Sequence, residues 1–361
     1  MLDRLPPKVL LRILRLAAPL DIGEEWSRDT QSAHKSHRTV LMRICLVNKQ
    51  LCGLAQPMLP EVFYVINDRQ EQQGKKLGKH IKKLKILHRE EVVSATLHVC
   101  PALEEARLGF GRPDSKAVDS LQNVNYLALH FVIPSSPTFP LFPHLVTLSF
   151  HHVKLAVPNS QSFFNVSRFP SLRNLGLGQI IDPGRFLYDE KAIVPGVDSA
   201  LAARLRVLVA YDEELAGFQV SSAAFKGTLG AVFEVQGPFG GTITPPRQTP
   251  LEHMQFRIPW VEAGEIFPVL ETYTAACSTL KTVQLPRRLR AKNVERAHRT
   301  AATALLDTLR SRNVKVLWSE SFDPHESPLV SPELVAWAEK EHERKAVEEA
   351  EGALRRLDVG A

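Results

Sequence analysis

The sequence predicts an α/β protein, in which an N-terminal three-helix module precedes an irregular repeat solenoid with a parallel sheet and outer helices or loops. Three observations favour this fold class. Apolar residues recur at helical spacing before residue 66, a leucine frame recurs from about residue 80, and a charged helical pattern closes the chain. We therefore expect three parts: a helical module over 1–66, a repeat domain over 67–320 with a loop insertion at about 212–250, and a charged C-terminal helix or cap over 321–361.

The first helix is expected from about residue 7 to residue 18. Val9, Leu10, Ile13 and Leu14 recur at helical spacing, and basic residues lie on the opposite side. The proline pair that precedes them suits a first helical turn, where a missing N–H costs nothing. The next proline along the chain ends the pattern.

Two further helices are expected in the apolar segments 40–47 and 51–55. Asn48 separates them, and its short side chain suits the N-cap of the third helix. Pro57 stops that helix. Three helices this short are marginal alone, so we expect them to pack together and to bury an apolar face on another surface.

Two pieces of this segment carry a family resemblance: Leu5-Pro6-Pro7-Lys8-Val9-Leu10 with Ile13-Leu14, and Cys45-Leu46-Val47-Asn48-Lys49-Gln50-Leu51. In this order they resemble the F-box, in particular its divergent fungal form, in which Ala-Gln-Pro leads into a strand-like segment. The chain departs from the family pattern at Lys8, where Glu is usual, and at Leu51 or Cys52, where Trp is frequent. An ordinary three-helix cap on the following domain is the alternative interpretation.

The resemblance implies that these helices dock on the small adaptor subunit of a cullin-based ubiquitin ligase. The residues carried over as the docking surface are apolar, and some of them must instead hold the three helices together: Leu5, Pro6, Val9, Leu10, Ile13, Leu14, Val47 and Leu51.

A repeated frame, Pro-x-Leu-x-x-Leu-x-Leu, organises the second part of the chain. Its first apolar positions, Leu103, Val124, Leu145 and Leu172, are 21, 21 and 27 residues apart. These intervals lie within the range of leucine-rich repeats, about 20–29 residues, so the frame resembles a degenerate form of that repeat. Alternate leucines of each short strand would point into a common core, and neighbouring units must stack to bury them.

Further strands are expected at 205–211, 251–258, 280–286 and 314–318, after a polar turn at 68–78. Helices are expected at 263–278, 291–312 and 332–357, and the last of these is highly charged. The glycine- and proline-rich stretch within 212–250 is interpreted as a loop.

The stacked repeats would present a concave sheet, lined by the polar positions between the frame leucines. This face is the expected binding surface for a protein substrate. Its candidate residues are Glu105, Arg107, Asn125, Ala128, His130, Thr147, Ser149, Arg173 and Asn174.

Composition and motifs indicate a binding protein and not an enzyme. No phosphate loop, nucleophile elbow or pair of metal-ligand motifs is present, so we expect no catalytic residue, no metal and no cofactor. The four cysteines have no paired spacing, and no secretory signal or long apolar run occurs. We therefore expect a cytoplasmic or nuclear protein without a membrane span.

The expected function is that of a substrate-recognition adaptor. The N-terminal module would bind the ligase adaptor subunit, and the repeats would hold an unknown protein substrate near the conjugating enzyme. Two alternatives remain open: a repeat scaffold without a ligase, and a basic nucleic-acid-binding repeat protein. The net charge of +6 and the lysine cluster at residues 75–85 favour the last, but no stacking motif accompanies them.

Overall fold

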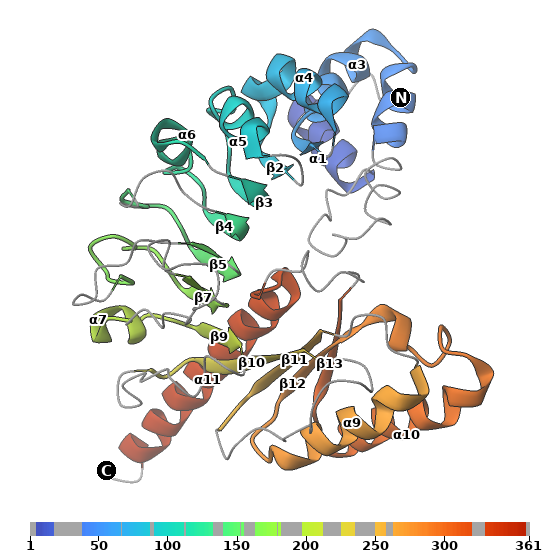
Figure 1. The fold of residues 1–361 in the computed structure, drawn as a ribbon, viewed down its shortest axis with the longest axis vertical. Coiled ribbons are helices and arrows are strands. Elements are labelled where there is room, and N and C mark those ends of the chain that lie inside the picture. The colour runs from blue at the N-terminus through green and yellow to red at the C-terminus, as the bar shows by residue number, and fades with distance from the viewer. Residues whose placement is uncertain are drawn as a thin grey trace.

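The computed structural model is α/β, with eleven parallel strands stacked into one curved sheet and helices along its outer side (Figure 1). It describes residues 5–17, 38–65, 67–86, 90–111, 113–132, 140–151, 153–154, 163–178, 180–181, 197–211, 225–234, 250–257, 263–319 and 329–358. Every strand of the main sheet pairs in parallel with the strand that follows it in that sheet, which is the arrangement of a solenoid.

The main sheet runs in chain order: β1 (Val62–Val65), β2 (Lys83–Ile86), β3 (Glu105–Gly111), β4 (Tyr126–Val132), β5 (Thr147–His151), β7 (Asn174–Leu177), β9 (Val207–Tyr211), β10 (Thr228–Glu234), β11 (His253–Arg257), β12 (Thr282–Pro286) and β13 (Lys315–Ser319). Two short strands, β6 (Val153–Lys154) and β8 (Ile180–Ile181), form a separate parallel pair.

The helices of the solenoid connect successive strands on the outer side of the arc (Figure 1). They are α4 (Asp68–Leu77), α5 (Glu90–Leu97), α6 (Ser115–Asp119), α7 (Ser199–Ala202), α9 (Ala263–Ala276) and α10 (Arg299–Ser311). Short 3₁₀ turns complete the connections at η3 (Gly78–His80), η4 (Arg287–Leu289) and η5 (Arg296–His298). Because a parallel pair needs a crossover, each helix or turn returns the chain to the start of the next strand.

Aligned leucines form the core between the sheet and these helices. Leu84, Leu127, Leu148, Leu175 and Leu208 occupy one register row across neighbouring strands, and all of them are buried. The residues next to them in each strand point to the opposite, concave face; they are polar in β5, where they are Thr147 and Ser149, and apolar in β9, where they are Val207 and Val209. The leucine frame therefore predicted the strands and the buried side of the sheet correctly.

The N-terminal module consists of α1 (Pro7–Ala17), helical residues 38–45, α3 (Lys49–Ala55) and η2 (Gln56–Met58). The Asn48 side chain caps α3, because its Oδ1 accepts a hydrogen bond from the Leu51 N–H at 2.8 Å. Helices therefore lie at the three places expected from the sequence, but the second ends at residue 45, so Leu46 and Val47 lie in a turn. The sheet begins directly after them, at Val62.

The helix expected over 291–312 begins only at Arg299, after the 3₁₀ turn η5. Two further expectations were wrong. Residues 68–77, expected as a polar turn, form α4: Asn67 caps its first turn, and Glu71 pairs with Lys75 one turn later at 2.5 Å. Strong helix formers and a cap outweighed the polar composition. Residues 228–234, expected within a loop insertion, form β10 because their alternating apolar residues pair with β9 and β11. Residues 212–224 and 235–249 lie outside the described residues.

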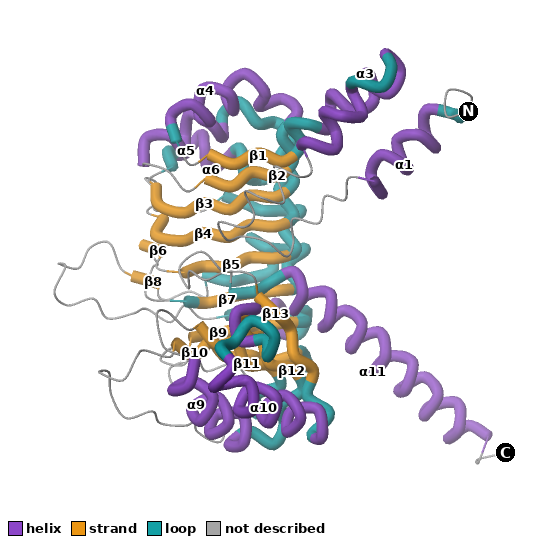
Figure 2. The backbone as a smooth tube through the Cα atoms, turned by 90° about the vertical axis from the view of Figure 1, so that its right-hand side faces the viewer, coloured by secondary structure: helices purple, strands orange, loops and turns teal. Residues whose placement is uncertain are grey.

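The C-terminal helix α11 (Pro332–Asp358) starts inside the curve of the sheet and then leaves it (Figures 1 and 2). Residues 329–331 before the helix are buried, and so are Leu334 and Ala338 in its first turns, whereas residues 346–351 are exposed on all sides. Figure 2 shows the rest of α11 projecting from the stack of strands. We refer to residues 329–338 as the buried C-terminal segment.

Candidate functional site

The structure divides the predicted docking residues of the N-terminal module into two groups. Leu10, Leu14 and Leu51 are buried and pack with Leu41, Ala55 and Met58 in a small core of the module's own. Val9, Ile13 and Val47 are exposed, and so is Pro6, while Leu5 is half-buried. The buried group holds the helices together, and the exposed group is available to a partner.

Exposed apolar side chains gather in this module. Among the described residues, seven large apolar side chains are exposed, and five of them lie between residues 9 and 47. Sequence reasoning missed two of the five, Met42 and Leu46; Leu46 is 86% exposed, and Val47 beside it is 66% exposed. Met42 lies in helical residues 38–45, which bury Leu41, and Leu46 lies in the turn that follows them, so helical spacing alone did not mark both.

The middle of the concave face is filled by the buried C-terminal segment. Leu329, Val330 and Leu334 are fully buried there and pack on Val207, Val209, Val232 and Leu317. A Cβ at Gly176 would lie 2.7 Å from the Leu329 Cβ, so β7 can pass this close only without a side chain at that position. The segment is therefore an integral part of the fold.

Three hydrogen bonds tie the segment to both halves of the sheet. The Leu329 N–H donates to Ser149 Oγ on β5 at 2.9 Å, and the Tyr126 hydroxyl on β4 donates to the Val330 carbonyl at 3.3 Å. The Ser331 hydroxyl donates to Gln284 Oε1 on β12 at 3.0 Å. Burial of Tyr126 raises the pKa of its phenol to about 12, so the hydroxyl stays protonated and able to donate.

Several predicted substrate residues therefore serve the fold. Ser149 contacts the C-terminal segment, and Thr147 and Asn174 are buried and bonded to each other, with Asn174 Nδ2 donating to Thr147 Oγ1 at 3.1 Å. His130 stacks on His151 with ring centroids 4.6 Å apart, and His151 stacks in turn on Tyr211 at 5.1 Å.

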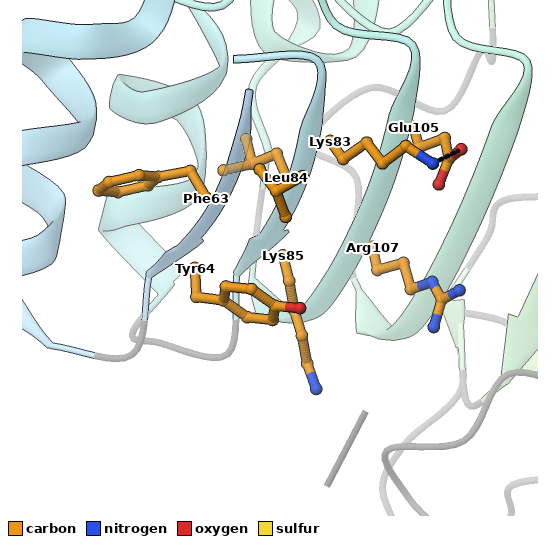
Figure 3. Close-up of a pocket in the computed structure, with 8 residues that line it drawn as sticks. Phe63, Tyr64, Lys83, Leu84, Lys85, Glu105 and Arg107 are labelled. Carbon is orange, nitrogen blue, oxygen red and sulfur yellow. Dashed lines mark hydrogen bonds and ion pairs between the residues drawn. The ribbon is translucent and has the colours of Figure 1, made fainter. Parts of the chain in front are cut away.

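The first strands carry the charged part of the concave face. Tyr64, Lys85 and Arg107 project from one face of β1, β2 and β3 and line a small hollow, and Lys83 pairs with Glu105 at 2.5 Å (Figure 3). The Arg107 guanidinium lies over the Tyr126 ring, 4.8 Å from its centroid. Burial lowers the pKa of Arg107, and its electrostatic interactions with Tyr126, Glu105 and Glu333 of α11 act in the opposite direction.

The remaining candidates lie elsewhere. Asn125 and Arg173 precede β4 and β7, at the N-terminal edge of the sheet and not on its concave face. Ala128 is a half-buried position of β4. The structure thus does not bring the nine predicted residues together into one accessible surface.

Neither metal nor membrane sites are found in the part of the chain that the structure describes. No group of three or more His, Cys, Asp or Glu side chains there could hold a metal ion. No helix among the described residues is both long and apolar enough to cross a membrane. No protein-family model matches the chain, and no curated protein is significantly similar to it.

Proposed function

We propose that the protein is a substrate-recognition adaptor of a cullin-type ubiquitin ligase and performs no chemistry itself. One observation carries this proposal: the N-terminal module has its own closed core and still exposes Val9, Ile13, Met42, Leu46 and Val47. Several exposed large apolar side chains within one small module are typical of protein interaction sites. The resemblance of the same segment to an F-box implies that the partner is the ligase's adaptor subunit.

In this proposal the solenoid holds the substrate and the module holds the ligase. Docking raises the effective concentration of the substrate at the conjugating enzyme, so no catalytic group is required in this chain. The buried C-terminal segment occupies the middle of the concave face. We therefore assign substrate binding to surfaces that this segment leaves accessible.

Co-purification with the adaptor subunit tests the proposal. Full-length protein is co-expressed with the adaptor subunit and captured by a tag on one partner. We expect stoichiometric capture of the wild-type chain, and loss of capture when Val9→Asp and Ile13→Asp place two charges in the apolar interface. Both residues are exposed, so the module should remain folded.

Val347→Asp is the matched control, because Val347 is an exposed valine on the projecting part of α11. This variant should be captured like the wild type. Capture of the Val9→Asp/Ile13→Asp variant at wild-type stoichiometry would show that the docking surface is wrong. If the wild-type chain were not captured either, the protein would instead be a repeat scaffold that does not bind the ligase.

A further inference from the structure

Four cations gather at the N-terminal edge of the sheet, over β7, β9 and β10. Arg173 precedes β7, Arg204 and Arg206 precede β9, and Lys226 precedes β10. We call these four residues the basic edge. Arg204 and Lys226 are exposed, and Arg173 and Arg206 are half-buried.

Backbone contacts bring these residues side by side. The Arg206 N–H donates to the Arg173 carbonyl at 2.6 Å, and the Thr228 N–H donates to the Arg206 carbonyl at 2.8 Å. The Arg204 guanidinium donates to the Pro170 carbonyl at 3.3 Å, which places it beside the turn before β7. Neighbouring strands are about 4.8 Å apart, so the four charges share a short stretch of the edge.

The basic edge differs from its neighbours in charge pairing. Before β2, Lys82 pairs with Glu61 and Glu104 at 3.7 and 3.6 Å, and before β12, Lys281 pairs with Glu252 and Glu341 at 3.1 and 3.6 Å; β3, β4 and β5 lie between β2 and the basic edge. None of the four basic-edge residues forms an ion pair with a carboxylate in the described chain; the guanidinium groups of Arg173 and Arg204 donate to the Leu172 and Pro170 carbonyls. A positive potential is therefore concentrated at this place.

An exposed leucine adjoins the basic edge. Leu141 is 51% exposed and is one of two exposed large apolar side chains among the described residues beyond the N-terminal module. The next residue, Phe142, donates its N–H to the Arg168 carbonyl at 2.9 Å, and Ser171 donates its hydroxyl to the Pro143 carbonyl at 2.6 Å. These bonds hold Leu141 against the turn that leads to Arg173.

From these observations we infer that the basic edge and Leu141 form a binding surface for an acidic protein segment that carries an apolar side chain. Guanidinium groups bind carboxylates with paired, charge-assisted hydrogen bonds, and an apolar residue of the partner covers Leu141. The inference does not depend on docking of the N-terminal module to a ligase.

A peptide fits this surface better than a nucleic acid does. The basic edge is short: Glu252, which precedes the next strand β11, pairs with Lys281, so the unpaired positive charge does not continue past β10 as a long polyanion would require. The apolar member is an aliphatic side chain, whereas single-stranded nucleic acids stack on aromatic ones. A short acidic peptide segment suits both the limited extent of the positive charge and the aliphatic side chain beside it.

Fluorescence anisotropy with full-length protein tests the inference. The probe is a fluorescein-labelled dodecapeptide with the repeat Glu-Glu-Leu, and the control peptide has the repeat Gln-Gln-Leu. We expect the acidic peptide alone to bind at about 50 mM salt, with an affinity that falls as salt is raised. Arg204→Gln with Lys226→Gln should weaken binding at least about tenfold, as loss of charge-assisted contacts predicts.

Lys76→Gln with Lys79→Gln is the matched control, because both lysines are exposed and the change in net charge is the same. It should leave the affinity unchanged, and Leu141→Ala should weaken it without changing the salt dependence. If both double variants lost peptide affinity equally, net charge alone would explain the effect, and the inference would be overturned. Absence of peptide binding, or tighter binding of a thymidine dodecanucleotide through Arg204 and Lys226, would also overturn it.

Since the same variants can be captured with the ligase adaptor subunit, the two proposals are separable. The Arg204→Gln/Lys226→Gln variant should lose the peptide and keep the adaptor subunit. The Val9→Asp/Ile13→Asp variant should do the reverse.

Discussion

At the scale of single residues, the concave face places polar side chains where they must lose water. His253 on β11 is fully buried, and its Nδ1 lies 2.8 Å from Thr282 Oγ1 on β12. Burial lowers the pKa of His253 to about 3 from its ordinary value of 6.5. The folded protein therefore keeps this imidazole neutral at every pH above about 3.

The depressed pKa of His253 predicts acid sensitivity. Below about pH 6.5 the unfolded chain binds a proton that the folded chain rejects, so the free energy of unfolding falls as the pH falls towards 3. The slope from this one group is at most about 1.4 kcal/mol per pH unit. His253→Asn, whose amide can keep the contact with Thr282, should remove that part of the slope in urea titrations at about pH 7 and about pH 5.

The exposed His80→Asn change is the control for this experiment and should leave the slope unaltered. An identical pH dependence in wild type and His253→Asn would show that His253 is protonated within the fold.

The sequence was also least informative about docking at the scale of single residues. All the residues carried over from the F-box resemblance are apolar or proline, so their types do not separate core from surface. The separation depends on where the third helix lies: α3 covers Leu10 and Leu14 and leaves Val9 and Ile13 exposed. A charge at Leu10 would therefore unfold the module and not test docking, because Leu10 is only 2% exposed.

At the scale of elements, most of the solenoid could be predicted because each strand carries its own signal. Leucines with period two fix both the strand and its buried side, as Leu175 and Leu177 do in β7. Helix α4 was missed because its single apolar residue gives no stripe; Leu77 ends a run of polar helix formers. Strand β10 was missed because its neighbours outside the strand are rich in glycine and proline.

Helix α3 provides an element-scale prediction. It has seven residues, too few to be stable alone, and the Asn48 side chain satisfies one of its first N–H groups. Asn48→Ala should lower the free energy of unfolding of the module by about 1 kcal/mol. Asn48→Asp should keep the cap and the stability, and urea denaturation of the full chain followed by circular dichroism measures both. If both variants lowered the free energy of unfolding equally, the loss would come from any change at residue 48 and not from loss of the cap.

At the scale of the whole molecule, the buried C-terminal segment joins parts of the solenoid that share no strand pairing. It contacts β4 and β5 through Tyr126 and Ser149, and β12 and β13 through Gln284 and Leu317. In a repeat array each unit otherwise contacts only its neighbours, so this segment makes unfolding of distant repeats interdependent. The sequence predicted only a charged cap, because the local composition of a helix does not indicate which distant strands it contacts.

Leu334→Ala tests this interdependence. Leu334 is fully buried and packs with Val207, Val209, Val232 and Leu317, so the cavity should cost about 2–5 kcal/mol. Because the segment contacts both arms of the arc, amide hydrogen exchange should accelerate together in β4 and in β13. Val347→Ala, on the exposed part of the same helix, should change neither. Acceleration confined to β13 and α11 would show instead that the segment is attached to one arm only, and that the first repeats are stable without it.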